Sequence, residues 1–307
     1  MLERLHVHVL DILVVDDHHS YRAKIEPQRQ DALHFIASSM GHASLCTTFD
    51  PFQLNSPNFS RDAVDGLNRD FEHAAIAVKI WKNIGMEIKN GSGQYVMLED
   101  PAFEPIYRDI AAKGKTLIIH AADPDPAWTA KYVIAGGAYY RENPEWDMSK
   151  NPNAPQKAAI LDGRDRVLGM HPDLRVIGAH FGSMETHLDE LAVRLDRYPS
   201  FAVDTSARVE TLTREPRDQV RAFFLKYQDR ILYGSDFSFD TQGQHKGTTA
   251  ASWEKQYLLE WRYFSTDDTF DYHGQQVEGL DLPLPVLEKL YHDNAVRWIP
   301  GIDANVR

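Results

Sequence analysis

The sequence predicts an α/β protein in which parallel strands alternate with helices. Short apolar runs recur between longer segments whose apolar residues are spaced three and four apart, which is typical of repeated βα units. No G-x-G-x-x-G or G-x-x-x-x-G-K-[ST] motif occurs, and polar side chains follow several widely separated runs. These observations favour a closed (β/α)8 TIM barrel over an open doubly wound sheet.

The strands are expected at seven apolar runs. In chain order they cover residues 9–15, 44–49, 75–81, 116–119, 175–179, 201–204 and 231–234. A closed barrel of this type has eight strands, so the sequence predicts a barrel that is one strand short.

Helices are expected between these runs and after the last of them. The segments with helical spacing are 27–40, 101–113, 184–197, 216–227 and 285–298. Asp100 followed by Pro101 is a strong helix start, because aspartate caps a helix and proline suits its first position. Gly114 is the matching stop signal.

We expect one domain over residues 1–307 with two long additions. Residues 121–153 carry aromatic side chains, Trp128 among them, between prolines and glycines, and are interpreted as a lid over a pocket, with a packed surface insertion as the alternative. Residues 241–307 are expected to form a C-terminal helical extension, whose aromatic side chains at helical spacing are more typical of core.

Composition excludes several classes of function. The chain carries 33 basic and 45 acidic residues, a net charge of −12, which argues against a nucleic acid or an anionic membrane surface as partner. With no long apolar stretch and no secretory signal pattern, a cytoplasmic location is expected. The single cysteine, Cys46, lies in an apolar run and is expected to be buried. The alternative, a catalytic thiol, has no neighbour that would lower its pKa.

Three apolar runs end on side chains that bind metal ions: His120, His180 and Asp236. Because the carboxyl ends of parallel strands meet at one face of a barrel, these three residues are expected to converge. Imidazole and carboxylate ligands suit zinc, with manganese or another divalent ion as alternatives. Such an ion activates water, and a nearby histidine or aspartate moves the proton.

Five segments together resemble the amidohydrolase superfamily. They are Val78 to Gly85, the Leu-Ile-Ile-His ending at His120, His171 to Gly182, Val203 to Arg208 and Leu232 to Asp236. More narrowly, they resemble the amidohydrolase-related branch that also contains aminocarboxymuconate-semialdehyde decarboxylase-like enzymes. The resemblance runs from about the second barrel strand to the last helix, and implies a TIM barrel of the metal-dependent hydrolase type.

The resemblance also implies roles for individual residues. His120 and Asp236 correspond to metal ligands, and His180 to a histidine that acts on substrate or water in this branch and binds metal in others. Arg208 is a candidate for gripping a substrate carboxylate, and a salt bridge that ties a loop is the alternative. Lys79 falls in a strand where some members carry a carboxylated lysine; since this branch typically uses one metal, Lys79 is predicted to contact substrate instead. Trp128, in the lid-like segment, is also predicted to contact substrate.

The chain departs from the family at its first strand, which there ends in H-x-H or E-x-H and supplies metal ligands. His6-Val-His8 has that motif but precedes its apolar run, so it is expected at the opposite end of the barrel. Strand 1 is therefore expected to be absent from this sequence. Three explanations are open: an upstream start, a natural variant with an incomplete site, or completion of the shell by Asp16 to His19, for which a solvated polar turn is the alternative. With only His120 and Asp236 secure, weak metal binding or none is expected.

The expected function is therefore a metal-dependent hydrolase in which metal-activated water attacks a small amide, ester or lactone. The first alternative is a nonoxidative decarboxylase of a small carboxylated substrate on the same scaffold. The second is a truncated or inactive barrel that only binds a ligand or a partner. A barrel one strand short has two free edges, so a homo-oligomer is a possible assembly.

Overall fold

The computed structural model describes residues 2–16, 25–129, 137–238 and 249–303. Of the sequence motifs, residues 17–19 of the Asp16 to His19 segment lie outside the described residues, as does part of each predicted addition, 130–136 and 241–248.

Seven parallel strands form one curved sheet, in the order of the chain. They are β1 (Val9–Ile12), β2 (Ala43–Thr47), β3 (Ala75–Ile80), β4 (Thr116–Ile119), β5 (Arg175–Gly178), β6 (Phe201–Asp204) and β7 (Ile231–Leu232). Within the described residues, β1 and β7 each pair with one neighbour and not with each other, so the sheet is a partial barrel. The predicted barrel fold, one strand short of closure, is confirmed.

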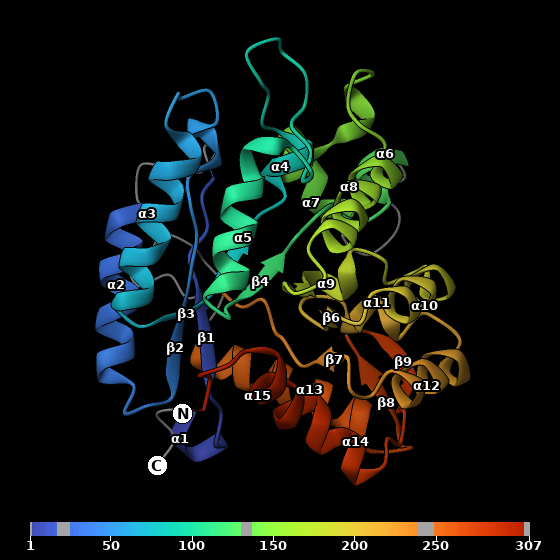
Figure 1. Ribbon diagram of the computed structural model, residues 1–307. Helices are drawn as coiled ribbons and strands as arrows, with labels where there is room; N and C mark the ends of the chain where they lie inside the picture. The colour runs from blue at the N-terminus through green and yellow to red at the C-terminus, as the bar shows by residue number, and fades with distance from the viewer. Residues whose placement is uncertain (1, 17–24, 130–136, 239–248, 304–307) are drawn as a thin grey trace.

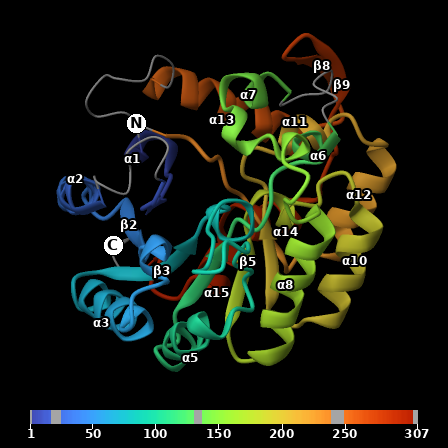
Figure 2. The same ribbon diagram turned by 90° about the horizontal axis from the view of Figure 1, so that it is seen from above.

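The long helices surround the outside of this sheet, as Figure 2 shows for the six between β1 and β7. Those six are α2 (Ile25–Ser38), α3 (Phe59–Glu72), α5 (Glu104–Ala112), α8 (Lys157–Met170), α10 (Leu188–Arg197) and α12 (Arg217–Lys226). A short helix, α1 (Leu2–Leu5), precedes β1. The Asp100 side chain accepts a hydrogen bond of 2.9 Å from the Ala102 amide, which confirms the predicted cap.

The two faces of the sheet pack against different partners, because side chains alternate along each strand. Leu117, Ile119 and Val203 belong to the core beneath the outer helices. Ile118, Ile177 and Ala202 face inward, where they share a second core with Trp298 and Ile299 of the C-terminal region. The inner face is therefore filled at one end by the C-terminal segment.

The C-terminal segment contains a strand pair that the sequence pattern did not predict. After α13 (Ala250–Ser265), the antiparallel strands β8 (Thr269–Tyr272) and β9 (Gln275–Glu278) interrupt the expected run of helices. Polar side chains alternate with buried Phe270, Tyr272 and Val277 there, and this two-residue period marks a half-buried hairpin. The last helix follows as α14 (Leu284–Glu288), a π-helical turn η6 (Lys289–Asp293) and α15 (Asn294–Trp298).

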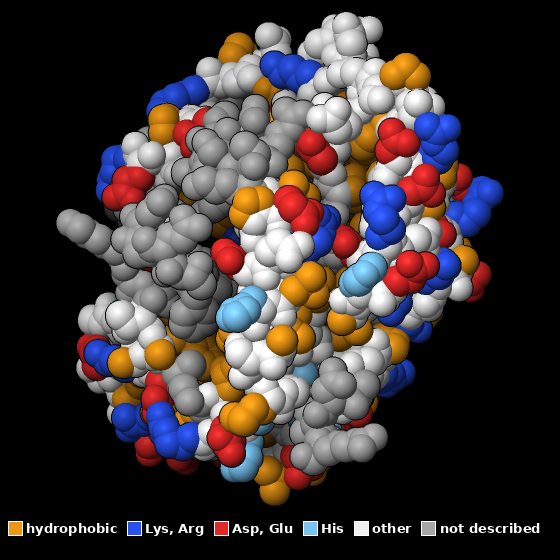
Figure 3. Space-filling view, turned by 90° about the vertical axis from the view of Figure 1, so that its left-hand side faces the viewer, with side chains coloured by type: hydrophobic (Ala, Val, Ile, Leu, Met, Phe, Trp, Pro, Cys, Tyr) orange, Lys and Arg blue, Asp and Glu red, His pale blue; other side chains and the backbone are white. Residues whose placement is uncertain are grey.

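The described helices include none with the length and apolar content of a membrane span. On the face in Figure 3, acidic and basic side chains are interspersed rather than gathered by sign. Cys46 is fully buried, as its apolar surroundings predicted.

Candidate functional site

Two buried histidines face each other at the carboxyl ends of β4 and β5. His120 follows β4 directly, and its ring centroid lies 4.2 Å from that of His180 in an edge-to-face arrangement. The connections after β3 and β4, which include α4 (Asn83–Met86), α6 (Pro126–Thr129) and α7 (Gly137–Glu142), gather at the same upper end in Figure 1. The predicted convergence of these two residues is therefore present.

His180 sits in a left-handed turn, α9 (Ala179–Gly182), in which His180 and Phe181 have φ of 58° and 57°. Such conformations cost about 1 kcal/mol or more per non-glycine residue and persist where surrounding contacts fix them. The His180 amide donates to Asp204 Oδ1 at 3.0 Å, and Arg164 Nη1 donates to the Gly182 carbonyl at 2.7 Å. These contacts hold the imidazole at a defined position.

Both imidazoles are neutral at neutral pH. Burial is the main cause that lowers the pKa of His120 to about 3 and the pKa of His180 well below 6.5. Among the described residues, neither ring nitrogen of His120 makes a hydrogen bond, whereas His180 Nδ1 lies 2.9 Å from the Ser206 carbonyl oxygen. Neutral imidazoles with free nitrogen lone pairs are good metal ligands.

Asp236 lies four residues beyond β7, with φ of 58°. Water reaches this residue, yet protein packs around its carboxyl closely enough that burial raises its pKa, while Lys79 and Arg208 oppose the rise. Solvent access offsets part of the burial effect. Lys79 also lowers the pKa of both histidines, so the predicted residues His120, His180, Asp236 and Lys79 share one electrostatic environment.

Two predicted substrate-binding residues lie at the inner face, on β3 and just past β6. Lys79 is buried on the same side of β3 as Ala77. Arg208 is also buried, and its Nε lies 3.3 Å from Glu185 Oε1. Glu185 is a buried partner that the sequence pattern did not indicate. Arg208 therefore forms a salt bridge, which was the alternative to substrate binding in the sequence analysis. Contact between Arg208 and substrate stays a prediction.

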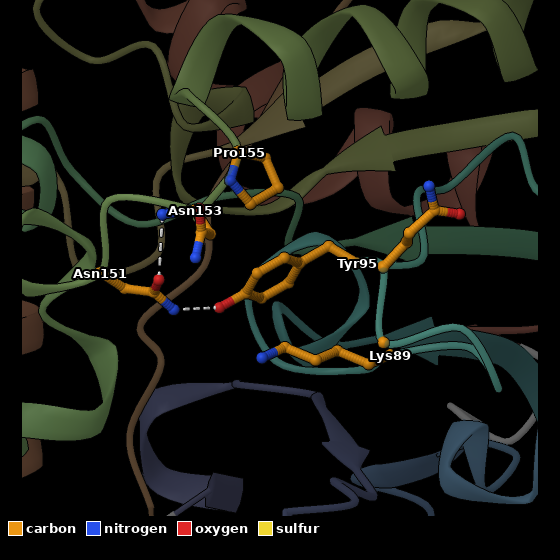
Figure 4. Close-up of a pocket in the computed structure, with 7 residues that line it drawn as sticks. Lys89, Tyr95, Asn151, Asn153 and Pro155 are labelled. Carbon is orange, nitrogen blue, oxygen red and sulfur yellow. Dashed lines mark hydrogen bonds between the residues drawn. The ribbon is translucent and has the colours of Figure 1, made fainter.

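Trp128 lies in α6 and takes part in none of the contacts given above. Its indole nitrogen donates to the Pro155 carbonyl at 2.9 Å, which ties the start of the predicted lid to its end. Nearby, a surface pocket of about 450 Å³ is lined by Lys89, Tyr95 and Asn153, and Asn151 donates to the Tyr95 hydroxyl there, as Figure 4 shows. This rim pocket includes none of the predicted site residues, and substrate contact by Trp128 stays a prediction.

A sequence model of a known enzyme family, described as amidohydrolase, matches residues 57–300. The chain belongs to the amidohydrolase family. No curated protein matches it in sequence.

Solved structures similar to this amidohydrolase have its fold at low sequence identity. An uncharacterised TIM-barrel protein from Bordetella bronchiseptica is 14% identical, with a TM-score of 0.53, over 91% of this chain and 73% of that chain. A 2,6-dihydroxybenzoate decarboxylase from Rhizobium is 16% identical, with a TM-score of 0.51, over 94% of this chain and 80% of that chain. A probable 2-pyrone-4,6-dicarboxylic acid hydrolase from Acinetobacter baumannii is 10% identical, with a TM-score of 0.51, over 97% of this chain and 85% of that chain.

The side chains of this amidohydrolase fit a divalent ion in part. The neutral imidazoles of His120 and His180 face each other, and the His120 ring nitrogens make no hydrogen bond to the described residues, which suits a divalent ion. In the described ranges, however, no three His, Cys, Asp or Glu side chains are grouped as a metal site. Asp16, the one described residue of the Asp16 to His19 segment, is buried near enough to Lys82 to affect its pKa. His8 precedes β1 and lies 2.9 Å from Ser44 Oγ, so His6-Val-His8 stands at the amino end, as expected.

A charged pair beside His120 was missed from the sequence. Lys82 Nζ donates to Asp123 Oδ2 at 2.7 Å, and Asp123 Oδ1 lies 3.3 Å from His120 Nε2, all three side chains being buried. Burial raises the pKa of Asp123, but Lys82 and His120 together hold it below its ordinary value. The available signal was that Lys82 lies two residues beyond β3 and Asp123 four residues beyond β4, at the strand ends where His120 was already expected.

Proposed function

We propose that this amidohydrolase is a metal-dependent hydrolase of a small amide, ester or lactone that carries a carboxylate. The observation that carries the proposal is the pair of buried, neutral imidazoles of His120 and His180 at the carboxyl ends of adjacent strands. Membership of the amidohydrolase family supports it.

Within this proposal, the chain's own residues divide the work. His120 and His180 hold a divalent ion, together with Asp236 or a residue of the Asp16 to His19 segment. When bound, the ion supplies Lewis-acid activation of water and of the scissile carbonyl. Asp236, whose pKa is raised by burial, accepts the proton that the attacking water loses.

Within the proposal, Arg208 and Lys79, the cationic side chains at the inner face of the sheet, bind the substrate. Arg208 presents a guanidinium that can grip both oxygens of a carboxylate. Lys79 adds a second positive charge beside the histidines, as its effect on their pKa values shows. A substrate with a negative charge near its scissile bond matches this environment.

The test combines metal analysis with product analysis. Protein produced with zinc or manganese in the medium is expected to hold about one divalent ion per chain. The His120→Ala variant is expected to lose this ion, whereas His292→Ala, a change at an exposed histidine, retains it. A wild-type protein free of metal under these conditions would contradict the proposal.

Product analysis separates hydrolysis from decarboxylation. Carboxylated lactones, cyclic amides and esters are incubated in isotopically labelled water, and label is expected in the ring-opened or cleaved product. Carboxylated aromatic compounds are incubated in parallel. Release of carbon dioxide without uptake of label would replace the hydrolase proposal by the decarboxylase alternative.

A further inference from the structure

Asp123 occupies the space between His120 and Lys82 and contacts both with different oxygens. Its Oδ2 accepts a hydrogen bond of 2.7 Å from Lys82 Nζ, and its Oδ1 lies 3.3 Å from His120 Nε2. The side chains of Asp123 and Lys82 are 4% and 3% exposed, so water competes little for either contact. A buried ion pair of this kind is poor evidence for stability.

Surrounding groups fix the Lys82 ammonium, and with it the orientation of Asp123. Lys82 Nζ also donates to the Tyr139 hydroxyl at 2.9 Å, and it lies 4.3 Å from the centre of the Trp146 ring. An ammonium group only donates hydrogen bonds, so it requires an acceptor on the Asp123 side. One carboxylate oxygen is therefore committed to Lys82, and the other faces His120.

The free carboxylate oxygen decides which nitrogen of His120 carries the proton. A carboxylate only accepts, so a neutral imidazole beside it is most stable with its hydrogen on the facing nitrogen, Nε2. At 3.3 Å the contact does not have the geometry of a hydrogen bond, but the negative charge of the carboxylate still favours N–H at this position. Nδ1 then keeps its lone pair, and it is buried without a hydrogen-bonding partner among the described residues.

We propose that Asp123, oriented by Lys82, is a positioning residue that holds His120 in the tautomer with hydrogen on Nε2 and so reserves Nδ1 for the site ion. The tautomer follows from the contacts alone, whereas the use of Nδ1 rests on the proposed function.

His180 provides an internal reference with the opposite arrangement. Its Nδ1 lies 2.9 Å from the Ser206 carbonyl oxygen, which only accepts, so its hydrogen is on Nδ1 and its lone pair on Nε2. The two facing histidines are therefore expected in opposite tautomers. A change at Asp123 is expected to affect one and not the other.

The test is the Asp123→Asn variant, which keeps the shape of the side chain. Lys82 is expected to attract the amide oxygen, which turns the NH2 group toward His120 Nε2. As a donor, this group would force the His120 hydrogen onto Nδ1. Nitrogen NMR of chelator-treated, 15N-histidine-labelled protein reads the tautomer directly, and His120→Gln identifies the His120 signals.

In wild-type protein we expect hydrogen on Nε2 of His120, and in Asp123→Asn on Nδ1, with His180 unchanged in both. A wild-type His120 with its hydrogen on Nδ1, or an Asp123→Asn spectrum identical to wild type, would overturn the proposal. The wild-type measurement decides this even where the variant does not fold.

The double variant Lys82→Met with Asp123→Asn tests the role of Lys82. Without the ammonium, the amide oxygen of the introduced asparagine is free to turn toward Nε2, so the wild-type tautomer is expected to return in a substantial share of molecules. A double variant that keeps the tautomer of Asp123→Asn would show that Lys82 does not orient the side chain at this position.

Metal affinity tests the second half of the proposal. Competition with a chromophoric chelator is expected to show zinc affinity lower by roughly 10 to 100 times in Asp123→Asn, the usual effect of losing a partner of a histidine ligand. An inverted tautomer with unchanged zinc affinity would refute the link to the ion. A wild-type protein without zinc affinity would refute the proposed function, while the tautomer result would still decide what Asp123 does.

Discussion

At the scale of single residues, several ionisable side chains are buried beside a side chain of opposite charge. Lys82 pairs with Asp123, Arg208 with Glu185, and the fully buried Arg164 with Asp165. Removal of one member of the Lys82–Asp123 or Arg208–Glu185 pair is expected to cost about 3 to 5 kcal/mol, because its partner would stay charged and buried. Asp165 also contacts Arg194, so it keeps an ion-pair partner when Arg164 is removed. Each pair therefore constrains both of its members.

Glu260 of α13 is a buried carboxyl held by neutral groups instead. The Tyr233 hydroxyl donates to its Oε2 at 2.7 Å, and Gln256 Nε2 donates to its Oε1 at 2.8 Å. Burial is the largest influence and raises the pKa of Glu260 above its ordinary value of 4.5, against the effect of these hydrogen bonds. The folded protein therefore binds the Glu260 proton more tightly than the unfolded chain does.

We expect Glu260→Gln to remove a pH dependence of stability. The raised pKa contributes stability that is complete below pH 4.5 and is lost as the pH rises through the folded-state pKa. Relative to Glu260→Gln, the wild type should lose stability over that window in urea unfolding at a series of pH values. Glu288→Gln, at an exposed position of α14, is the control and should leave the profile unchanged. Parallel profiles for wild type and Glu260→Gln would contradict the prediction.

At the scale of elements, the turn after β5 holds four consecutive residues, His180 to Ser183, at positive φ. The left-handed residues of α9 lie directly against the last residue of β5, Gly178. A Cβ atom at Gly178 would lie 2.8 Å from the Gly182 Cα and 2.8 Å from Phe201 Cζ, closer than real contacts allow. Glycine at this position is therefore what lets the turn fold back and place His180.

Gly178→Ala is expected to destabilise the protein by about 1 to 3 kcal/mol, the usual cost of overpacking, and to shift the His180 NMR signals. The matched control is Gly169→Ala in α8, where a new Cβ meets no atom within 4 Å. That change should stabilise by up to about 1 kcal/mol, because alanine favours the helix. Urea unfolding measures both, and equal midpoints for the two variants would refute this account of the turn.

At the scale of the whole molecule, the C-terminal segment closes the inner face of the partial barrel. Trp298 of α15 packs in the inner core that contains Cys46 and Ile177. Its indole nitrogen donates to the Asp229 carbonyl at 3.0 Å, and Asn294 donates to the Ile231 carbonyl at 2.7 Å. The last helix thus joins β2, β5 and the start of β7 into one unit.

The rate at which a thiol reagent labels Cys46 measures how often the inner core opens. Burial raises its pKa to about 12, so the folded protein should resist thiol reagents until it opens. Trp298→Ala is expected to cost about 3 to 5 kcal/mol and to speed Cys46 labelling roughly a hundredfold or more, if opening is at equilibrium. Leu284→Ala, at a residue that is 64% exposed, should change the rate little. Equal labelling rates for Trp298→Ala and wild type would show that α15 does not protect the inner core.

The sequence by itself determined the seven strands, four of the six outer helices (α2, α5, α10 and α12), the cap at Asp100 and the placement of His120, His180 and Asp236 at strand ends. It did not predict the other two outer helices, α3 and α8. These features depend on local periodicity, on capping chemistry and on the rule that parallel strands end at one face. Tertiary structure decided the left-handed turn at His180 and the pairings of Asp123 with Lys82 and of Arg208 with Glu185. Such contacts join residues that are distant in sequence, and they depend on how the curved sheet brings separate strand ends within a few ångströms. No local pattern encodes that approach.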